Sequence, residues 1–140
     1  RVRGGGSALL HTRYARRPVA GCLAVCPVCD LKYHFTERPD LPMSIRYAFR
    51  GYAEPLEQLF AEHSAIAQVP AMPDVPYWIV HGDKDRAVSK AQHSDRFVAA
   101  MHARGRRITY VEVPGMGHCG PLPAAVLQAK IDFVAGLAGC

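Results

Sequence analysis

Apolar residues follow two distinct patterns along this chain, and each pattern predicts a different element. Three short runs are rich in apolar and β-branched residues: 19–26, 77–80 and 108–113. Such runs are typical of strands in a buried parallel sheet. Elsewhere, helices are predicted from the spacing of apolar residues and from capping residues: 8–17, 56–63, 89–104 and from about 123 to 137.

Strands that alternate with helices imply right-handed crossovers and a parallel sheet covered on both faces. The expected fold class is therefore α/β, a three-layer sandwich with a mostly parallel sheet flanked by helices. Three strands make a small sheet and the chain does not begin with Met, so we expect an incomplete fold or a fragment. We predict one domain over residues 1–140, in which residues 32–53, with their prolines and aromatics, form an irregular, cap-like excursion.

The excess of positive charge is confined to one end of the chain. Five arginines and no acids lie in residues 1–17, and the other 12 basic residues balance 12 acidic ones. A local arginine cluster is typical of a solvated face, so no nucleic-acid partner is expected. No apolar run reaches the length of a membrane span, so no membrane partner is expected. Five cysteines, an odd number, favour reduced thiols and a cytoplasmic location.

Two short motifs directly follow the second and third predicted strands: His81–Asp85 (HGDKD) and Pro114–His118 (PGMGH). The carboxyl ends of parallel strands meet at one edge of a sheet, where loops bring distant residues together. Acyl transfer needs a hydroxyl nucleophile, a histidine that takes and returns its proton, and a carboxylate that orients the imidazole. The motifs supply a candidate base, His118, and a candidate acid, Asp85 or Asp83.

These motifs resemble those of a known family. Residues from about 70 to 134 are similar to the C-terminal part of an α/β-hydrolase, closest to the prolyl oligopeptidase and dipeptidyl-peptidase-like serine hydrolases. The segments that carry the resemblance are Pro76–Val88, Ser94–Gly105 and Val113–His118, and Val25–Leu31 resembles the strand after the nucleophile helix. In that family the matching acid and histidine belong to the catalytic triad, which implies Asp85 and His118 here.

The candidate nucleophile is Ser7. A nucleophile elbow reads Gly-x-Ser-x-Gly, because its sharp strand-to-helix turn leaves no room for flanking side chains. The segment Gly5–Leu9 keeps the first glycine and the serine, but Leu9 stands where the second glycine is expected. The resemblance implies that Ser7 is the nucleophile and that the backbone N–H of Ala8 forms half of an oxyanion hole. The alternative is that Gly4–Ser7 is a flexible start to the chain.

The leading functional hypothesis is a serine hydrolase without cofactor or metal. It would cleave a peptide or ester bond of a small substrate through an acyl-enzyme intermediate. The second hypothesis is a truncated, non-catalytic remnant, motivated by Leu9 and by the missing first half of the sheet. A partial sheet exposes an edge strand, which predicts self-association.

The cysteines offer competing sites. Cys22, Cys26 and Cys29 have the spacing with which radical enzymes hold an iron–sulfur cluster, but the first two lie in an apolar run, where Cys behaves as a small hydrophobe. A thioredoxin-like pair of Cys26 and Cys29 lacks a helix-opening sequence after it. A zinc site drawing on Cys26, Cys29 and Cys119 lacks a paired second motif.

Polar residues outside these motifs carry weaker expectations. His81 is predicted to be a structural part of the turn after its strand, and His93 to lie on a helix surface. Glu37 and the aromatic residues of 33–52 either line a substrate pocket or pack in an ordinary core.

Overall fold

The computed structural model describes residues 5–138, and its sheet has three parallel strands in these residues. They are β1 (Cys22–Val25), β2 (Tyr77–Gly82) and β3 (Ile108–Val113), in the order β1-β2-β3. All three strands predicted from the apolar runs are confirmed. β2 is buried at every position, because it has a strand on each side and helices over each face.

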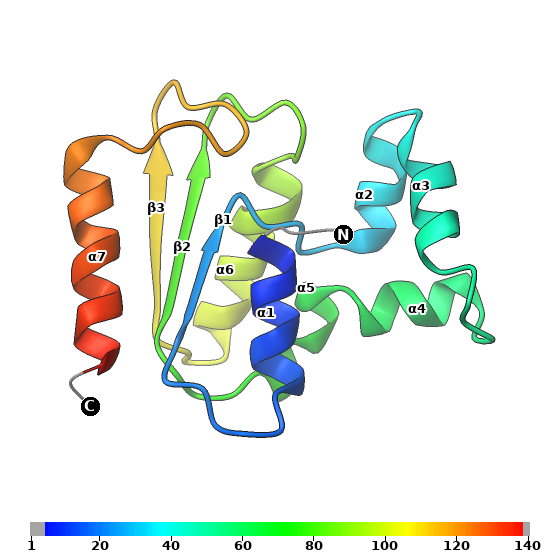
Figure 1. Ribbon diagram of the computed structural model, residues 1–140, viewed down its shortest axis with the longest axis horizontal. Coiled ribbons are helices and arrows are strands. Elements are labelled where there is room, and N and C mark those ends of the chain that lie inside the picture. Colours follow the sequence, from blue (N-terminus) through cyan, green and yellow to red (C-terminus); the bar gives the residue numbers. More distant parts are fainter. Residues whose placement is uncertain (1–4, 139–140) are drawn as a thin grey trace.

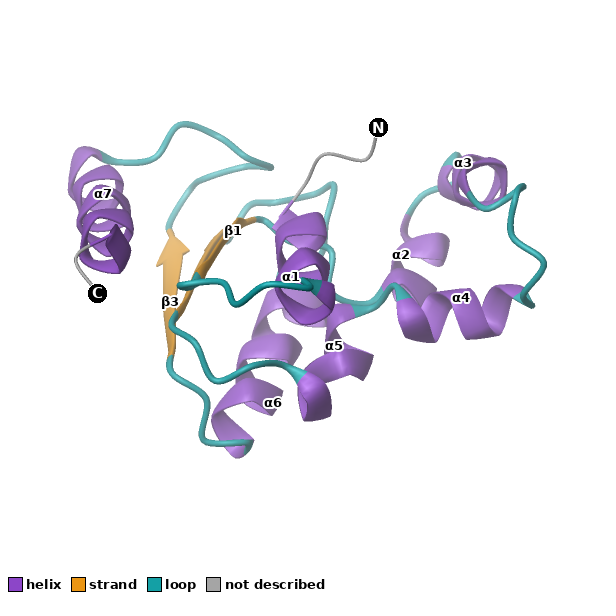
Figure 2. Cartoon of the chain, turned by 60° about the horizontal axis from the view of Figure 1, so that its bottom comes forward, coloured by secondary structure: helices purple, strands orange, loops and turns teal. Residues whose placement is uncertain are grey.

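Helices cover both faces of this sheet (Figures 1 and 2). α1 (Gly5–Tyr14), α5 (Ala65–Gln68) and α6 (Arg96–Ala103) lie on one face, and α7 (Ala124–Ala138) lies on the other. Alternate residues of β2 point to opposite faces of the sheet. Tyr77 and Ile79 join the core beneath α1 and α6, whereas Trp78 and Val80 join the core beneath α7. The expected three-layer α/β architecture is confirmed.

Residues 32–53 are mostly helical, so the prediction of an irregular segment is wrong. α2 (Leu31–Glu37) and α3 (Leu41–Ala48) occupy this segment, and α2 packs on both α3 and α4 (Leu56–Glu62). The side chain of Asp30 caps α2 by accepting a hydrogen bond from the N–H of Tyr33 at 2.9 Å. Pro42 lies in the first turn of α3, where an N–H would have no intrahelical partner. Pro42 therefore helps to start a helix rather than prevent one.

These three helices form a lobe beside the sheet, called here the α2–α4 lobe (Figure 1). Its own small core contains Leu41, Ile45 and Phe60. The short helix η1 (Val69–Ala71) then leads from α5 toward β2. None of the described helices is both long and apolar enough to span a lipid bilayer.

The helix predicted from Ser89 starts with a wider turn. Ser89 Oγ accepts a hydrogen bond from the N–H of Gln92 at 3.3 Å, and the π-helical segment η2 (Ala91–Asp95) precedes α6. His93 and Ser94 in this segment are buried. The π-helical turn thus places two polar side chains inside the protein, next to the loop that follows β2.

Candidate active site

Asp85 and His118 lie in the loops that leave β2 and β3, and the structure brings them into contact. His118 Nδ1 is 2.8 Å from Asp85 Oδ2. The side chain of Asp85 is fully buried, whereas that of His118 is 43% exposed. The histidine therefore has one nitrogen held by a buried carboxylate, while the rest of its ring is accessible from outside.

Four hydrogen bonds occupy both oxygens of Asp85. Oδ1 accepts from the N–H groups of Ala87 and Val88, each at 2.9 Å. Oδ2 contacts His118 and also His81 Nε2, at 3.1 Å. Burial alone raises the pKa of Asp85, but the hydrogen bonds from Val88, His118 and Ala87 outweigh burial and hold that pKa below its usual value. Asp85 is therefore an ionised carboxylate that only accepts hydrogen bonds.

The acceptor character of Asp85 fixes the tautomer of His118. Because Asp85 only accepts, the proton of a neutral His118 lies on Nδ1 and the lone pair lies on Nε2. Nε2 is 3.7 Å from Cys119 Sγ, and His118 lines a cavity of about 500 Å³. A neutral imidazole with a fixed Nδ1–H and an accessible Nε2 is the arrangement that a general base needs.

His81 supports Asp85 from the interior. His81 is fully buried, with Nδ1 2.7 Å from Ser94 Oγ and Nε2 3.1 Å from the carbonyl oxygen of Val88. Since both partners of Nε2 are acceptors, Nε2 carries the proton and Nδ1 accepts from the Ser94 hydroxyl. Burial lowers the pKa of His81, and its contacts with Val88 and Asp85 oppose that shift only in part. The structural role predicted for His81 agrees with these contacts, whereas nothing in the sequence pointed to Ser94.

Asp83, the competing acid, has a different role. Its Oδ1 accepts a hydrogen bond from the N–H of Gly115 at 2.6 Å, so it joins the loops after β2 and β3. These loops also meet at Gly82, where an added Cβ would lie 2.0 Å from the carbonyl oxygen of Met116. Only glycine fits that approach. The geometry therefore favours Asp85 as the acid that orients His118.

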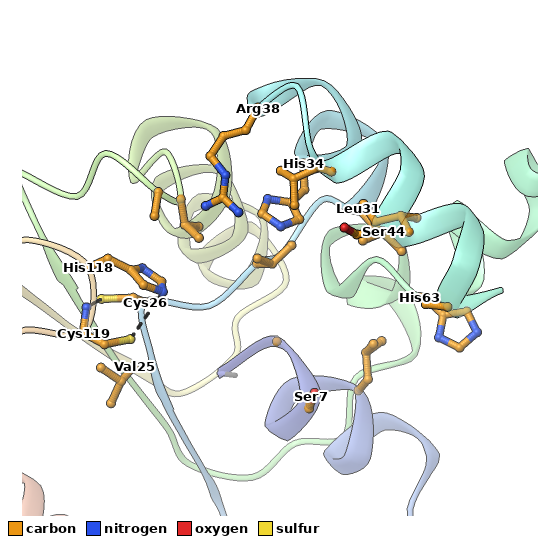
Figure 3. A pocket seen from close by; sticks show the side chains of 18 of the residues that line it. Ser7, Val25, Cys26, Leu31, His34, Arg38, Ser44, His63, His118 and Cys119 are labelled. Atoms are coloured by element: carbon orange, nitrogen blue, oxygen red, sulfur yellow. Dashed lines mark hydrogen bonds between the residues drawn. The ribbon is translucent and has the colours of Figure 1, made fainter. Parts of the chain in front are cut away.

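Ser7 lies within α1 rather than at a turn between a described strand and a helix. α1 begins at Gly5, so Ser7 is its third residue. Ser7 lines the same cavity as His118, and Figure 3 shows it on the helix, apart from the histidine. Ala8, expected to contribute an oxyanion N–H, is partly buried and packs against the core beneath α1. The roles of Ser7 and Ala8 stay predictions.

Two glycines bring the start of α1 against the chain that leaves β1. An added Cβ at Gly5 would lie 2.7 Å from the carbonyl oxygen of Val25, and one at Gly6 would lie 2.4 Å from that of Val28. A nucleophile elbow requires glycine where its sharp turn becomes a helix. In this structure such glycines precede Ser7, whereas the elbow pattern places one of them two residues after the serine.

A second polar cluster, which the sequence did not reveal, joins the α2–α4 lobe to the loop after β2. Glu37 Oε2 is 2.5 Å from His34 Nδ1 and 3.0 Å from His93 Nε2. Glu37 Oε1 accepts from the N–H of Ser89 at 2.7 Å. Burial raises the pKa of Glu37, but the hydrogen bonds from His34, Ser89 and His93 bring it below its usual value. Glu37 thus holds α2 against the segment that follows Asp85.

His93 is fully buried, so the expectation that it lies on a helix surface is wrong. The π-helical turn of η2 directs it inward, where Nδ1 accepts from the N–H groups of Cys29 and Asp30, both at 3.1 Å. Nε2 consequently carries the proton and donates it to Glu37. These partners lie 56 to 64 residues away along the chain, so local pattern could not reveal them.

A parallel sheet with helices on both faces, an acid after one strand and a histidine after the next defines the α/β-hydrolase fold. The family assignment follows from the sequence, since the model of the prolyl oligopeptidase family matches residues 4–136. The chain belongs to the prolyl oligopeptidase family, a family of serine hydrolases. No curated protein matches the sequence significantly.

Solved structures agree with this fold. A puromycin-hydrolyzing peptidase from Mycobacterium tuberculosis superposes with a TM-score of 0.76 at 17% identity, over 96% of this chain and 20% of that one. A mutant puromycin hydrolase in complex with PGG gives a TM-score of 0.75 at 20% identity, over 96% and 21%. Esterase B from Lactobacillus rhamnosis gives 0.69 at 14% identity, over 97% and 50%. The chain thus spans about a fifth of the first two structures that it matches.

Proposed function

We propose that Asp85 and His118 are the acid and base of a serine hydrolase that cleaves a peptide or ester bond through an acyl-enzyme intermediate. The observation that carries this proposal is the buried, fourfold hydrogen-bonded Asp85 with its 2.8 Å contact to His118 Nδ1. Membership of the prolyl oligopeptidase family supports the same chemistry. So does the likeness of the fold to a puromycin hydrolase and an esterase.

In the proposed reaction, His118 Nε2 takes the hydroxyl proton of the nucleophile as its oxygen attacks the carbonyl carbon of the substrate. Asp85 stabilises the resulting imidazolium. His118 then gives the proton to the departing amine or alcohol, and an ester to the nucleophile remains. Water, activated in turn by His118, hydrolyses that ester. Ser7 is the candidate nucleophile because its side chain lines the same cavity as His118.

The cavity suggests the kind of group that the substrate presents. Its wall on the side of the α2–α4 lobe is mostly apolar, with Leu31, Leu41, Ile45 and Phe49, and Arg38 adds a positive charge to the described lining. An apolar side chain or acyl group would bury surface there. We therefore propose a small peptide or ester with an apolar group near the bond that is cleaved.

Labelling with a fluorophosphonate probe tests the nucleophile directly. The proposal predicts that the probe modifies the chain at Ser7, as shown by peptide mass mapping, and that Ser7→Ala abolishes the modification. Ser44→Ala is the matched control, because Ser44 lines the same cavity on α3 but is not the candidate nucleophile. Complete absence of labelling, or labelling that persists in Ser7→Ala, contradicts the assignment.

A second candidate function is favoured by one specific observation. Gly5 and Gly6, where α1 lies closest to the chain after β1, both precede Ser7. If either of them is the second glycine of the elbow pattern, which follows the serine by two residues, the serine position falls before Gly5. Residues 1–4 are Arg, Val, Arg and Gly, none of which is a nucleophile. The chain would then hold an acid and a base but no turnover of its own. Hydrolysis of a p-nitrophenyl ester by the purified chain, abolished by His118→Ala, would refute this candidate.

The edges of the sheet suggest that the chain associates with copies of itself. β1 and β3 are the outer strands of the described sheet, and an unpaired strand edge is a template for pairing with another chain. We propose self-association through such an edge. It predicts a concentration-dependent increase in mass in sedimentation experiments, and a concentration-independent monomer contradicts it.

A further inference from the structure

We propose that Cys26, Cys119 and His118 form a binding site for a thiophilic divalent cation such as Zn²⁺. The two sulfur atoms and a ring nitrogen lie within 4.8 Å of one another. Figure 3 shows the three side chains together at one side of the cavity. Thiolate and imidazole are the ligands that Zn²⁺ prefers in proteins. The proposal concerns binding alone, so it stands whether or not the chain hydrolyses a substrate.

Two unusual backbone conformations bring the sulfurs together. Cys26, which follows β1, has φ of 44°, and Cys119, in the loop after β3, has φ of 49°. Such positive values are uncommon for residues other than glycine and are maintained only by their surroundings. The N–H of Cys119 donates to Cys26 Sγ at 3.4 Å, which ties one loop to the other. Both cysteines thus face a common point from separate loops.

The third ligand is already oriented toward that point. His118 gives its Nδ1–H to Asp85, so its free lone pair is on Nε2, 3.7 Å from Cys119 Sγ. A histidine ligand of zinc usually donates its other N–H to a carboxylate, which fixes the ring and makes it a better ligand. Asp85 has that role here.

The spacing suits a tetrahedral ion. With bonds of about 2.3 Å to sulfur and about 2.0 Å to nitrogen, two ligand atoms of a tetrahedral zinc site lie roughly 3.5 Å apart. The observed 3.7 Å between Cys119 Sγ and His118 Nε2 needs little adjustment, and the other two pairs, within 4.8 Å, would have to close by at most roughly 1 Å. Both thiols bind as thiolates, so binding releases their two protons to solvent. Three protein ligands leave a fourth position, which a water molecule or a ligand in the cavity can fill.

The same reasoning rejects the other clusters of metal-binding side chains among the described residues. His34, Glu37 and His93 lie close together, but His93 Nδ1 accepts two backbone N–H groups, so its Nε2 is protonated and has no lone pair to offer. His81 beside Asp85 is protonated at Nε2 because both partners of that nitrogen are acceptors, and its Nδ1 accepts from Ser94. The sulfur of Cys29 is 3.7 Å from the carbonyl oxygen of Pro27 and belongs to the core beneath α1 and α6.

One consequence is that the cation would compete with the proposed general base. An ion bound to Nε2 occupies the lone pair with which His118 would accept a proton. Bound Zn²⁺ would therefore inhibit any hydrolysis that His118 supports, and a chelator would restore it.

Titration of the reduced chain with Co²⁺, a spectroscopic substitute for Zn²⁺, tests the site. The wild-type chain should develop a thiolate-to-cobalt charge-transfer band and the intense visible bands of tetrahedral cobalt, with one ion per chain, and Zn²⁺ should abolish both. Cys119 is exposed, so Cys119→Ser leaves the core unchanged and is the variant of choice. We expect it to weaken binding by at least about tenfold and to reduce the charge-transfer intensity.

Cys22→Ala is the matched control, because Cys22 is a buried cysteine of β1 outside the site. It should bind Co²⁺ as the wild type does. Circular dichroism should show that each variant remains folded. A wild-type chain without a thiolate-to-cobalt band overturns the proposal, and so does a Cys119→Ser variant with undiminished affinity and band intensity.

Discussion

The two halves of the candidate site are built in different ways. At the acid and base half, Asp85 is fully buried, accepts four hydrogen bonds and holds His118 by one nitrogen. At the nucleophile half, Ser7 is exposed and lies within α1, beyond the glycines that press this helix onto the chain after β1. The two halves thus differ in position: the acid and the histidine lie in loops at strand ends, as their motifs predict, whereas the serine lies within a helix.

The largest expected effect comes from removing the carboxylate. Asp85→Ala removes the acceptor of the Ala87 and Val88 N–H groups and one of the two acceptors of His81 Nε2, so we expect the free energy of unfolding to fall by about 3–5 kcal/mol. Urea denaturation measures this change. Asp83→Ala is the control, because it removes the hydrogen bond from Gly115 at a partly exposed position, and should cost at most about 1 kcal/mol. Equal losses would show that the acid half is not specially supported.

A smaller effect tests the close contact at the start of α1. Gly6→Ala places a Cβ against the Val28 carbonyl oxygen, so we expect a loss of about 1–3 kcal/mol in the free energy of unfolding. Gly136→Ala is the matched control, because a Cβ there meets nothing within 4 Å in helix α7. That change should stabilise the protein by about 0.5–1 kcal/mol. Stabilisation by both substitutions would contradict the packing described for α1.

The dependence of stability on pH tests the buried histidines. Burial lowers the pKa of His81 and of His93, so the unfolded chain takes up their protons first as pH falls. Their contribution is fully present above about pH 6.5 and is lost below it, with a slope of up to about 1.4 kcal/mol per pH unit for each. The lowered pKa of Asp85 adds a further loss below about pH 4.

His93→Gln should therefore reduce the slope of unfolding free energy against pH between about pH 6.5 and pH 5. The reduction should be up to about 1.4 kcal/mol per pH unit, which corresponds to one proton. His102→Gln is its control, since His102 is exposed on α6. Urea denaturation over this pH range gives both slopes. An unchanged slope in His93→Gln would mean that His93 is not buried in its neutral form.

The smallest expected effect concerns Ser7. Its side chain is exposed on α1, so Ser7→Ala should change the free energy of unfolding by no more than about 0.5 kcal/mol. If the variant is as stable as the wild type, its loss of probe labelling results from the missing hydroxyl and not from unfolding. A large destabilisation would instead give Ser7 a structural role.

The sequence pattern predicted the parts of this fold that depend on residues close together along the chain. The strands follow from buried apolar runs, and Asp85 and His118 follow from motifs at strand ends. The helices α2 and α3 were missed because Pro39 and Pro42 resemble helix breakers, whereas Pro42 lies in a first turn, where no N–H is needed. Predicting them required recognition of Asp30 as a cap.

The remaining parts of the site depend on contacts between residues that are distant in sequence. Ser94 supports His81 across 13 residues, and Cys26 meets Cys119 across 93. Neither pair has a local signature. The π-helical turn that buries His93 also follows no simple period, so an exposed position was the natural expectation for a histidine on a helix.

The tautomer of His118 tests the central claim most directly, since the proposed base and the proposed cation site both require a lone pair on Nε2. Nitrogen-15 NMR of the histidine-labelled chain at pH 8, with His118 assigned by comparison with His118→Gln, measures it. Bound as described to Asp85, His118 should show a protonated Nδ1 and an unprotonated Nε2. A His118 with its proton mainly on Nε2, or with an even mixture of the two tautomers, would contradict the account.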